Sequence, residues 1–180
     1  MSVPALPRRE AGVSRLGLGA YALAAAVLVL DQLSKLWVLE GLKLEERGSI
    51  EVLPILSLSM VWNRGVSFGL LQAQQDLARW GLAAFSAAVA VALVLWARRV
   101  QRPLLATALG LIIGGAVGNL IDRVRFGAVA DFIDVSGLGF FPWVFNVADS
   151  AITIGVLLLV LDSLTPAKRT AAMAPQSGID

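Results

Sequence analysis

The 180-residue sequence contains neither cysteine nor histidine. Without cysteine, the chain has no disulfide, no thiol nucleophile and no thiolate metal site. Without histidine, it has no Ser-His-Asp triad and no imidazole metal ligand. Proton transfer must therefore use carboxylates, lysine, tyrosine or water. Any metal site would need oxygen ligands throughout, and we expect neither a metal nor a cofactor.

Charge is also scarce, because charged residues make up 16% of the chain and hydrophobic residues 57%. The mean hydropathy is +0.76, whereas an ordinary soluble domain is about one quarter charged. The excess of apolar residues is concentrated in four long runs, which predicts one small α-helical integral membrane domain. The net charge is only +2. Basic residues flank the runs instead of forming a nucleic-acid-binding face, so no nucleic-acid partner is expected.

The apolar runs predict four transmembrane spans, at about residues 16–38, 80–97, 104–122 and 143–164. A signal peptide is the alternative for the first run, since arginines precede it. The apolar stretch is longer than a signal-peptide core of about 7–15 residues, however, and no small-residue cleavage site follows it. Residues 1–15 and 165–180 are predicted to be disordered cytoplasmic tails.

The basic residues predict the orientation of the spans. One side carries a basic loop directly after the second run and basic tails: Arg8, Arg9, Arg15, Arg98, Arg99, Arg102, Lys168 and Arg169. The other side has an excess of acidic residues: Glu40, Glu45, Glu46, Glu51, Asp76, Asp131 and Asp149. The positive-inside rule therefore places both termini in the cytoplasm and the acidic ends of the spans near the outer leaflet.

The longest polar connection, residues 40–77, is predicted to be an extracytoplasmic cradle of a small β-sheet and an interfacial helix. Residues 42–47 resemble a short interfacial helix. Residues 56–60 alternate with period two, which is typical of a strand.

A turn is indicated at residues 63–65, so the segment Val66 to Leu71 could return as a second strand. The resulting sheet would lie on the membrane, with Asn63 and Phe68 facing whatever binds there. An equally strong interpretation of Asn63 is an ordinary turn residue.

Polar residues interrupt the first and third runs. Asp31 and Lys35 stand four residues apart, so they share a helix face and are predicted to pair. The pair could fix the first helix against its neighbours or contact a substrate, and Lys35 could instead snorkel to the outer interface. In the third run, glycines recur every four residues and predict a seam for close helix approach: Gly110, Gly114 and Gly118.

Asn119, Asp122 and Arg123 lie on an adjacent stripe at the end of the third run. They indicate a functional site, and the alternative is a solvated helix end. Residues 124–143 are predicted to form a short outer loop that contains Asp131 and Asp134.

The fourth run places Asn146, Asp149 and Thr153 on one face of an otherwise apolar helix. A solvated carboxylate favoured by the helix dipole is the alternative for Asp149.

Ionisable residues near a bilayer are costly and usually functional. Two carboxyl groups that share a site cannot both ionise easily, so one acts as an acid and the other as a base near neutral pH. Our hypothesis is a membrane-embedded aspartic protease in which Asp131 and Asp149 activate water. Asp31, Asp122 and Asp134 are rival carboxylates, and spacing alone does not decide among them.

Four motifs in this order over the four spans carry a family resemblance: DQLSK, WNRGVSFG, GGAVGNLIDRVRFGAVADF and FNVADSAI. Over residues 16–164 the sequence closely resembles lipoprotein signal peptidase, also called signal peptidase II. The resemblance implies an aspartic endopeptidase of the bacterial cytoplasmic membrane. Such an enzyme removes signal peptides from prolipoproteins just before the diacylglyceryl-modified cysteine.

The resemblance also implies roles for individual residues. Asp131 and Asp149 match the catalytic pair, and the segment 40–77 matches a cradle for the substrate. Asp134 lies outside the motif core and is interpreted as a surface acid. The expected partners are lipidated prolipoprotein signal peptides and membrane lipids, with the chain as a monomer. Positions that match substrate-binding or site-supporting residues are Asn63, Gly65, Asn119, Asp122, Arg123, Asn146 and Ala148, together with the first-helix pair Asp31 and Lys35.

Three other functions remain alternatives. A small transporter or channel could use the same acids as a proton relay, although the spans lack clear inverted repeats. A Ser–Lys protease could use Ser34 or Ser67 with Lys35, but adjacent residues of a helix, such as Ser34 and Lys35, point apart. The last alternative is a metal-dependent lipid enzyme.

Overall fold

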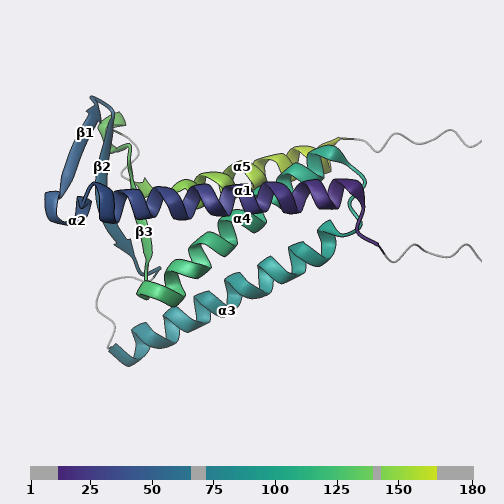
Figure 1. Ribbon diagram of the computed structural model, residues 1–180, viewed down its shortest axis with the longest axis horizontal. Helices are drawn as coiled ribbons and strands as arrows, with labels where there is room; N and C mark the ends of the chain where they lie inside the picture. The colour runs from purple at the N-terminus through teal and green to yellow at the C-terminus, as the bar shows by residue number, and fades with distance from the viewer. Residues whose placement is uncertain (1–11, 66–71, 140–142, 166–180) are drawn as a thin grey trace, which may run out of the picture.

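The computed structural model describes residues 12–65, 72–139 and 143–165. Four long helices run along the longest axis, and a small sheet lies at one end, here called the sheet end (Figure 1). The helices are α1 (Arg15–Leu36), α3 (Gln72–Ala97), α4 (Pro103–Phe126) and α5 (Val147–Leu164). All four are long and apolar enough to cross a membrane. This confirms the predicted helical membrane fold with a small sheet.

The ends of the predicted spans differ from the observed helices. Helix α3 begins eight residues before the expected 80, and α4 continues to Phe126 instead of ending near residue 122. Helix α5 begins only at Val147, because residues Val144–Phe145 form strand β4. Ser14 belongs to the fold and not to a disordered tail: its hydroxyl accepts from Gly17 N at 2.9 Å and donates to Val100 O at 2.8 Å. The remaining tail residues, 1–11 and 166–180, lie outside the described residues.

The sheet end contains the predicted cradle in part. Helix α1 continues as a π-helical turn, η1 (Trp37–Gly41), and the expected interfacial helix is α2 (Leu44–Arg47). The expected strand is β2 (Leu56–Asn63), which pairs with β1 (Ser49–Leu53). The predicted strand at residues 66–71, with Phe68, lies outside the described residues.

The other partner of β2 is β3 (Val129–Asp134), and β4 completes an antiparallel sheet in the order β1-β2-β3-β4. The prediction of an outer loop over residues 124–143 is therefore wrong. Its first residues finish α4, β3 is an inner strand of the sheet, and Ser136–Leu138 forms a 3-10 turn, η2. The strand escaped prediction because its partner β2 lies about 70 residues earlier, which leaves no local sequence signal.

Packing under the sheet fixes β3. Val38, Leu44 and Phe132 form a buried apolar cluster that joins η1 and α2 to this strand. Burying a large apolar side chain contributes about 1.5–3 kcal/mol. The cluster therefore holds the sheet on η1, the continuation of α1.

Helix α4 is the centre of the helical bundle and packs against α1, α3 and α5. Its glycines allow backbone contact: a Cβ at Gly110 or Gly114 would lie 2.7 or 2.6 Å from a carbonyl oxygen of α1. A Cβ at Gly115 would lie 2.5 Å from the carbonyl oxygen of Ala148 in α5. The close approach of another helix that Gly110 and Gly114 predict is confirmed for α1, and Gly115, outside the predicted seam, allows the same approach of α5.

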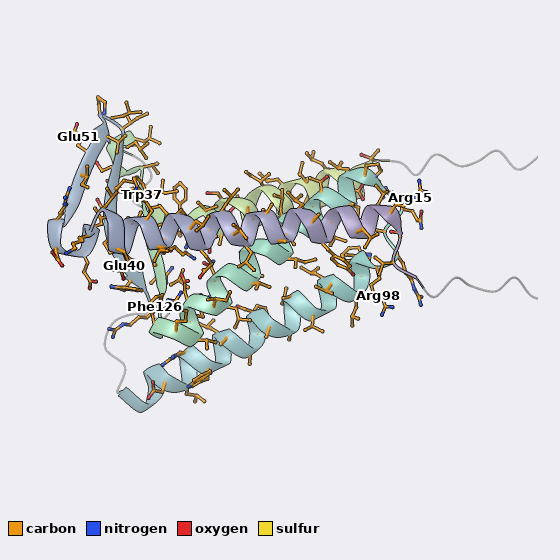
Figure 2. The ribbon with its side chains drawn as sticks, viewed as in Figure 1. Arg15, Trp37, Glu40, Glu51, Arg98 and Phe126 are labelled. Carbon is orange, nitrogen blue, oxygen red and sulfur yellow. The ribbon has the colours of Figure 1, made fainter. Side chains whose placement is uncertain are left out.

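Charged side chains lie at both ends of the helical bundle. Arg15 and Arg98 lie at the end opposite the sheet, whereas Glu40 and Glu51 lie at the sheet end (Figure 2). At the arginine-rich end, Arg102 Nη1 pairs with the buried Asp162 Oδ2 at 3.0 Å.

Candidate active site

Strand pairing brings Asp131 next to the start of α5. Strands β3 and β4 pair with Ile133 opposite Phe145, and the chain leaves β4 at Asn146, the N-cap of α5. The fully buried Asn146 side chain donates from Nδ2 to Asp131 Oδ1 at 2.7 Å and to the Ala130 carbonyl at 3.3 Å. The sheet therefore places Asp131 directly beside the first turn of a membrane helix.

Asp149 occupies that first turn and forms a capping box with Asn146. The Asp149 backbone N–H donates to Asn146 Oδ1 at 2.9 Å, and the Asn146 backbone N–H donates to Asp149 Oδ2 at 3.3 Å. Asn119 of α4 donates from Nδ2 to Asp149 Oδ1 at 2.8 Å. Asn146 thus binds Asp131 through its side chain and Asp149 through its backbone, which brings the two carboxylates into one site.

Asn63 is the last residue of β2 and reaches Asp131 from the other side. Because Val61 pairs with Asp131 and Asn63 with Val129, Asn63 and Asp131 are diagonal neighbours on one face of the sheet. Asn63 Nδ2 donates to Asp131 Oδ2 at 2.9 Å, while Asn63 Oδ1 accepts from Gly65 N at 2.9 Å. Asn63 is therefore both a turn residue and a site residue, and Gly65 has the positive φ of +71° that favours glycine.

The environment of Asp131 favours its protonated form. The residue is only 2% exposed, and burial raises its pKa to about 6 from the ordinary 3.8. The nearby negative charge of Asp149 also raises this pKa, whereas hydrogen bonds from Asn63 and Asn146 and the positive charge of Lys35 lower it. Asp131 can therefore carry a proton close to neutral pH.

A buried ion cluster lies behind the site. Lys35 Nζ lies 2.8 Å from Asp31 Oδ2 and 2.7 Å from Asp122 Oδ2, and it donates to Asn119 Oδ1 at 3.2 Å. The predicted pair of Asp31 and Lys35 is confirmed, and it connects α1 to α4. Lys35 is 3% exposed and does not snorkel to the interface. Asn119 and Asp122 are also buried, so the alternative of a solvated helix end is wrong for them.

The two carboxylates of this cluster are anchored at both oxygens. Asp31 Oδ1 accepts from the Ala148 N–H at 3.0 Å, and Asp122 Oδ2 accepts from the Ala130 N–H at 3.2 Å. Gln32 Nε2 donates to Asp122 Oδ1 at 3.1 Å. Because Ala148 and Ala130 stand next to Asp149 and Asp131, the cluster fixes the backbone that carries both site carboxylates.

Sequence reasoning did not assign a role to Gln32. Its signal was weak, because one amide in an apolar helix has many possible partners. In the structure Gln32 also donates to Asp31 Oδ2 on its own helix at 3.2 Å and to the Gly118 carbonyl of α4 at 3.3 Å. Only the packing of α1 on α4 reveals that it completes the ion cluster.

Arg123 lies half-buried at the sheet end of α4. Its Nη1 donates to the Asn119 carbonyl at 3.3 Å, and its positive charge is attracted by Asp149, Asp131 and Asp122. Arg123 therefore gives the site a cation close to its acidic residues.

Geometry separates the rival candidates that spacing left open. Asp31 and Asp122 are both paired with Lys35. Asp134 accepts from Ser136 N at 2.9 Å at the edge of the sheet, and hydrogen bonds from Ser136 lower its pKa, as suits a surface acid.

Other sequence candidates have different surroundings. Thr153 is exposed on α5. Ser34 Oγ donates to the Asp31 carbonyl at 2.8 Å, whereas Ser67 lies outside the described residues. Within the described ranges, no group of three or more Asp or Glu residues is placed to hold a metal ion.

Comparisons with known proteins agree with this architecture. A family model described as Signal peptidase (SPase) II matches residues 23–165. The lipoprotein signal peptidase of Caulobacter vibrioides is 55% identical over 152 residues, which cover 84% of this chain and 89% of that protein. The lipoprotein signal peptidase of Methylorubrum extorquens is 50% identical over 144 residues, which cover 80% of this chain and 84% of that protein.

A solved structure agrees as well. It is described as a bacterial membrane enzyme determined by the in meso method at 1.9 Å resolution, and it superposes with a TM-score of 0.72 at 29% sequence identity. The match covers 88% of this chain and 100% of the other. These relatives do not favour a transporter or channel. The chain therefore belongs to the signal peptidase II family of proteases, as a multi-pass protein of the bacterial inner membrane.

Proposed function

We propose that this chain is an aspartic endopeptidase that cleaves bacterial prolipoproteins just before their diacylglyceryl-modified cysteine. The relatives named lipoprotein signal peptidase support the substrate class. The observation that carries the aspartic mechanism is the double role of Asn146, which binds one carboxylate through its side chain and the other through its backbone. Two carboxylates held by one residue can act on one water molecule.

The two carboxylates have different environments, and this suggests their roles. Asp149 accepts two N–H donors at the N-terminus of α5, where the helix dipole favours negative charge. It serves as the base that takes a proton from water. Asp131 is buried, with a pKa of about 6, and serves as the acid. It donates a hydrogen bond to the carbonyl oxygen during attack and then gives a proton to the leaving amine.

The surrounding residues support this chemistry. Asn63, Asn119 and Asn146 orient the carboxylates. Arg123 serves to bind a substrate carbonyl or a lipid headgroup oxygen through its guanidinium.

Asp31, Lys35 and Asp122 fix the backbone behind the pair. Ala148 must be small, because Gly115 and Gly118 of α4 pass close to it. Gly65 holds the turn that orients Asn63. All of these residues come from one chain, so a monomer contains a whole site.

The proposed orientation has both termini in the cytoplasm and the sheet end at the outer leaflet. The positions of Arg15 and Arg98 at one end and of Glu40 and Glu51 at the other support it (Figure 2). The lipidated cysteine of a prolipoprotein lies at a leaflet surface, so the carboxylates would meet the scissile bond at that depth. The signal peptide itself must unwind locally there, because a helix otherwise keeps its carbonyls hydrogen-bonded.

The test is cleavage of a diacylglyceryl-modified prolipoprotein by purified variants, with the unlipidated precursor in parallel. Asp131→Asn and Asp149→Asn should each reduce kcat/KM by at least about 100-fold, as expected when a general acid or base is lost. Asp134→Asn is the matched control, because it removes a surface carboxylate from the same strand, and it should keep full activity. Substantial cleavage by either of the first two variants, in folded form, would reject the aspartic assignment.

A further inference from the structure

Arg79 lies in α3 directly before residues 80–96, which carry no charge, and it is half-buried against the sheet end of α4. Its guanidinium donates from Nε to the Arg123 carbonyl and from Nη2 to the Val124 carbonyl, both at 2.8 Å. The Cζ atom also lies 4.9 Å from the centre of the Trp80 ring. Arg79 thus binds two consecutive carbonyls of a neighbouring helix with two sides of one planar group.

The position is chemically suited to an arginine. The last carbonyls of a helix lack intrahelical partners and form the negative end of its dipole. Gly127 ends α4 with a positive φ of +77°, and its N–H donates to the same Arg123 carbonyl at 3.1 Å. A Cβ at Gly127 would lie 3.3 Å from Arg79 Nη1, so the glycine also leaves room for the guanidinium. A lysine carries a similar charge but cannot form this planar pair of bonds.

The turn that Arg79 holds leads directly into the site. Arg123 has its carbonyl bound by Arg79 while its own side chain lies among the site carboxylates. Four residues after Gly127 the chain reaches Asp131, whose backbone neighbour Ala130 donates to Asp122. A shift of the last turn of α4 would therefore move Arg123 and the start of β3 together.

We infer that Arg79 is a positioning residue of the peptidase site: it ties α3 to the last turn of α4 and so sets the places of Arg123 and Asp131. The inference rests on the proposed function for its effect on catalysis. Its structural part, the connection of α3 to α4, does not depend on which residues are catalytic. The two parts can therefore be tested separately.

The catalytic test compares Arg79→Met and Arg79→Lys with Arg125→Met. Arg125 is the matched control, since it is an exposed arginine at the same helix end whose guanidinium lies over the Phe126 ring. Arg79→Met should lower kcat/KM by about 10- to 100-fold, mostly through kcat, because small misplacements of reacting groups are costly. Arg79→Lys should restore part of kcat, and Arg125→Met should match the parent protein.

The structural test uses spin labels at Leu77 of α3 and Leu33 of α1, whose side chains are 76% and 57% exposed. The absence of cysteine makes labelling at two introduced cysteines unambiguous. Arg79→Met should broaden and lengthen the distance distribution without substrate, and Arg125→Met should leave it unchanged. If Arg79→Met does not fold, Arg79→Lys decides, with a smaller change in both measurements.

The inference is overturned if the folded Arg79 variants keep both the parental kcat/KM and the parental distances. A changed distance with parental kcat would also overturn it, because the connection would then have no role in positioning. If instead Asp131→Asn retained activity while Arg79→Met lost it, the aspartic assignment would fail and the role of Arg79 would stand.

Discussion

Replacing Asn63 with alanine should move the pH profile of the enzyme towards higher pH. The Asn63 side chain donates to Asp131 Oδ2 at 2.9 Å, and this bond lowers the pKa of Asp131 by favouring its charged form. Burial nevertheless keeps that pKa at about 6. Without the bond, desolvation and the charge of Asp149 are opposed by fewer groups, so the pKa must rise further.

The size of the shift follows from the strength of the bond. A hydrogen bond to a charged group contributes about 1.5–3 kcal/mol, which corresponds to about one to two pKa units. Asn63 is exposed, so water can replace part of its contribution, and the lower limit is the better guide. We therefore expect a rise of about one unit.

The assay is kcat/KM for a lipidated prolipoprotein peptide between pH 5 and pH 9. The basic limb of this profile reports the acid of the free enzyme, here the upper apparent pKa of the aspartate pair. In Asn63→Ala the limb should lie about one pH unit higher than in the parent. Ser59→Ala is the control on the same strand, since the Ser59 hydroxyl contacts Ser49 across the hairpin. A limb that stays in place or moves to lower pH would refute the electrostatic reasoning.

Three further predictions concern stability. Lys35→Met leaves two buried carboxylates without their cation and should cost about 3–5 kcal/mol, seen as a large fall in Tm in detergent micelles. Gly115→Ala sets a methyl group against the Ala148 carbonyl and should lower both Tm and activity, by about 1–3 kcal/mol in stability, whereas Gly81→Ala meets nothing within 4 Å and should not. Asp131→Asn should gain stability relative to the parent as pH rises. Because the pKa of Asp131 is raised to about 6, the parent is most stable below pH 3.8, where this group is protonated, and its free energy of unfolding falls by up to about 3 kcal/mol as pH rises through about 6. The variant has no such group and does not lose this stability. Equal Tm differences at pH 4 and pH 8 would contradict the last prediction.

The helical part of the fold could be predicted because its signals are local. Apolar runs, flanking arginines and glycines at intervals of four residues are each visible within about 25 residues of sequence. The glycine seam shows this well, since Gly110 and Gly114 were identified by spacing and do contact α1 at backbone distance. The boundaries were less accurate where an apolar strand directly precedes an apolar helix, as at Val144–Phe145 before α5, because hydropathy does not distinguish the two.

The sequence indicates candidate site residues but not the contacts among them. The residue types Asp and Asn near a membrane boundary suggested Asp131 and Asp149, yet spacing could not separate them from Asp31 and Asp122. That separation depends on Lys35, which binds both of the latter across two helices. Strand β3 was missed for the same reason, because its pairing with β2 is a long-range contact. Non-local contacts of this kind leave no periodic pattern in the chain.

The glycine contacts along α4 have a consequence for how the enzyme tolerates its lipid surroundings. At these glycines the backbones of neighbouring helices are in direct contact. The spacing of α1, α4 and α5 is therefore set by backbone contact and cannot be changed by a side-chain rotamer. Changes in bilayer thickness or lateral pressure would then be absorbed by the part of α3 beyond Arg79, since α3 is the least enclosed of the four long helices and Arg79 holds its sheet end on α4. The polar side chains on α1, α4 and α5 would then keep their relative positions in membranes of very different composition.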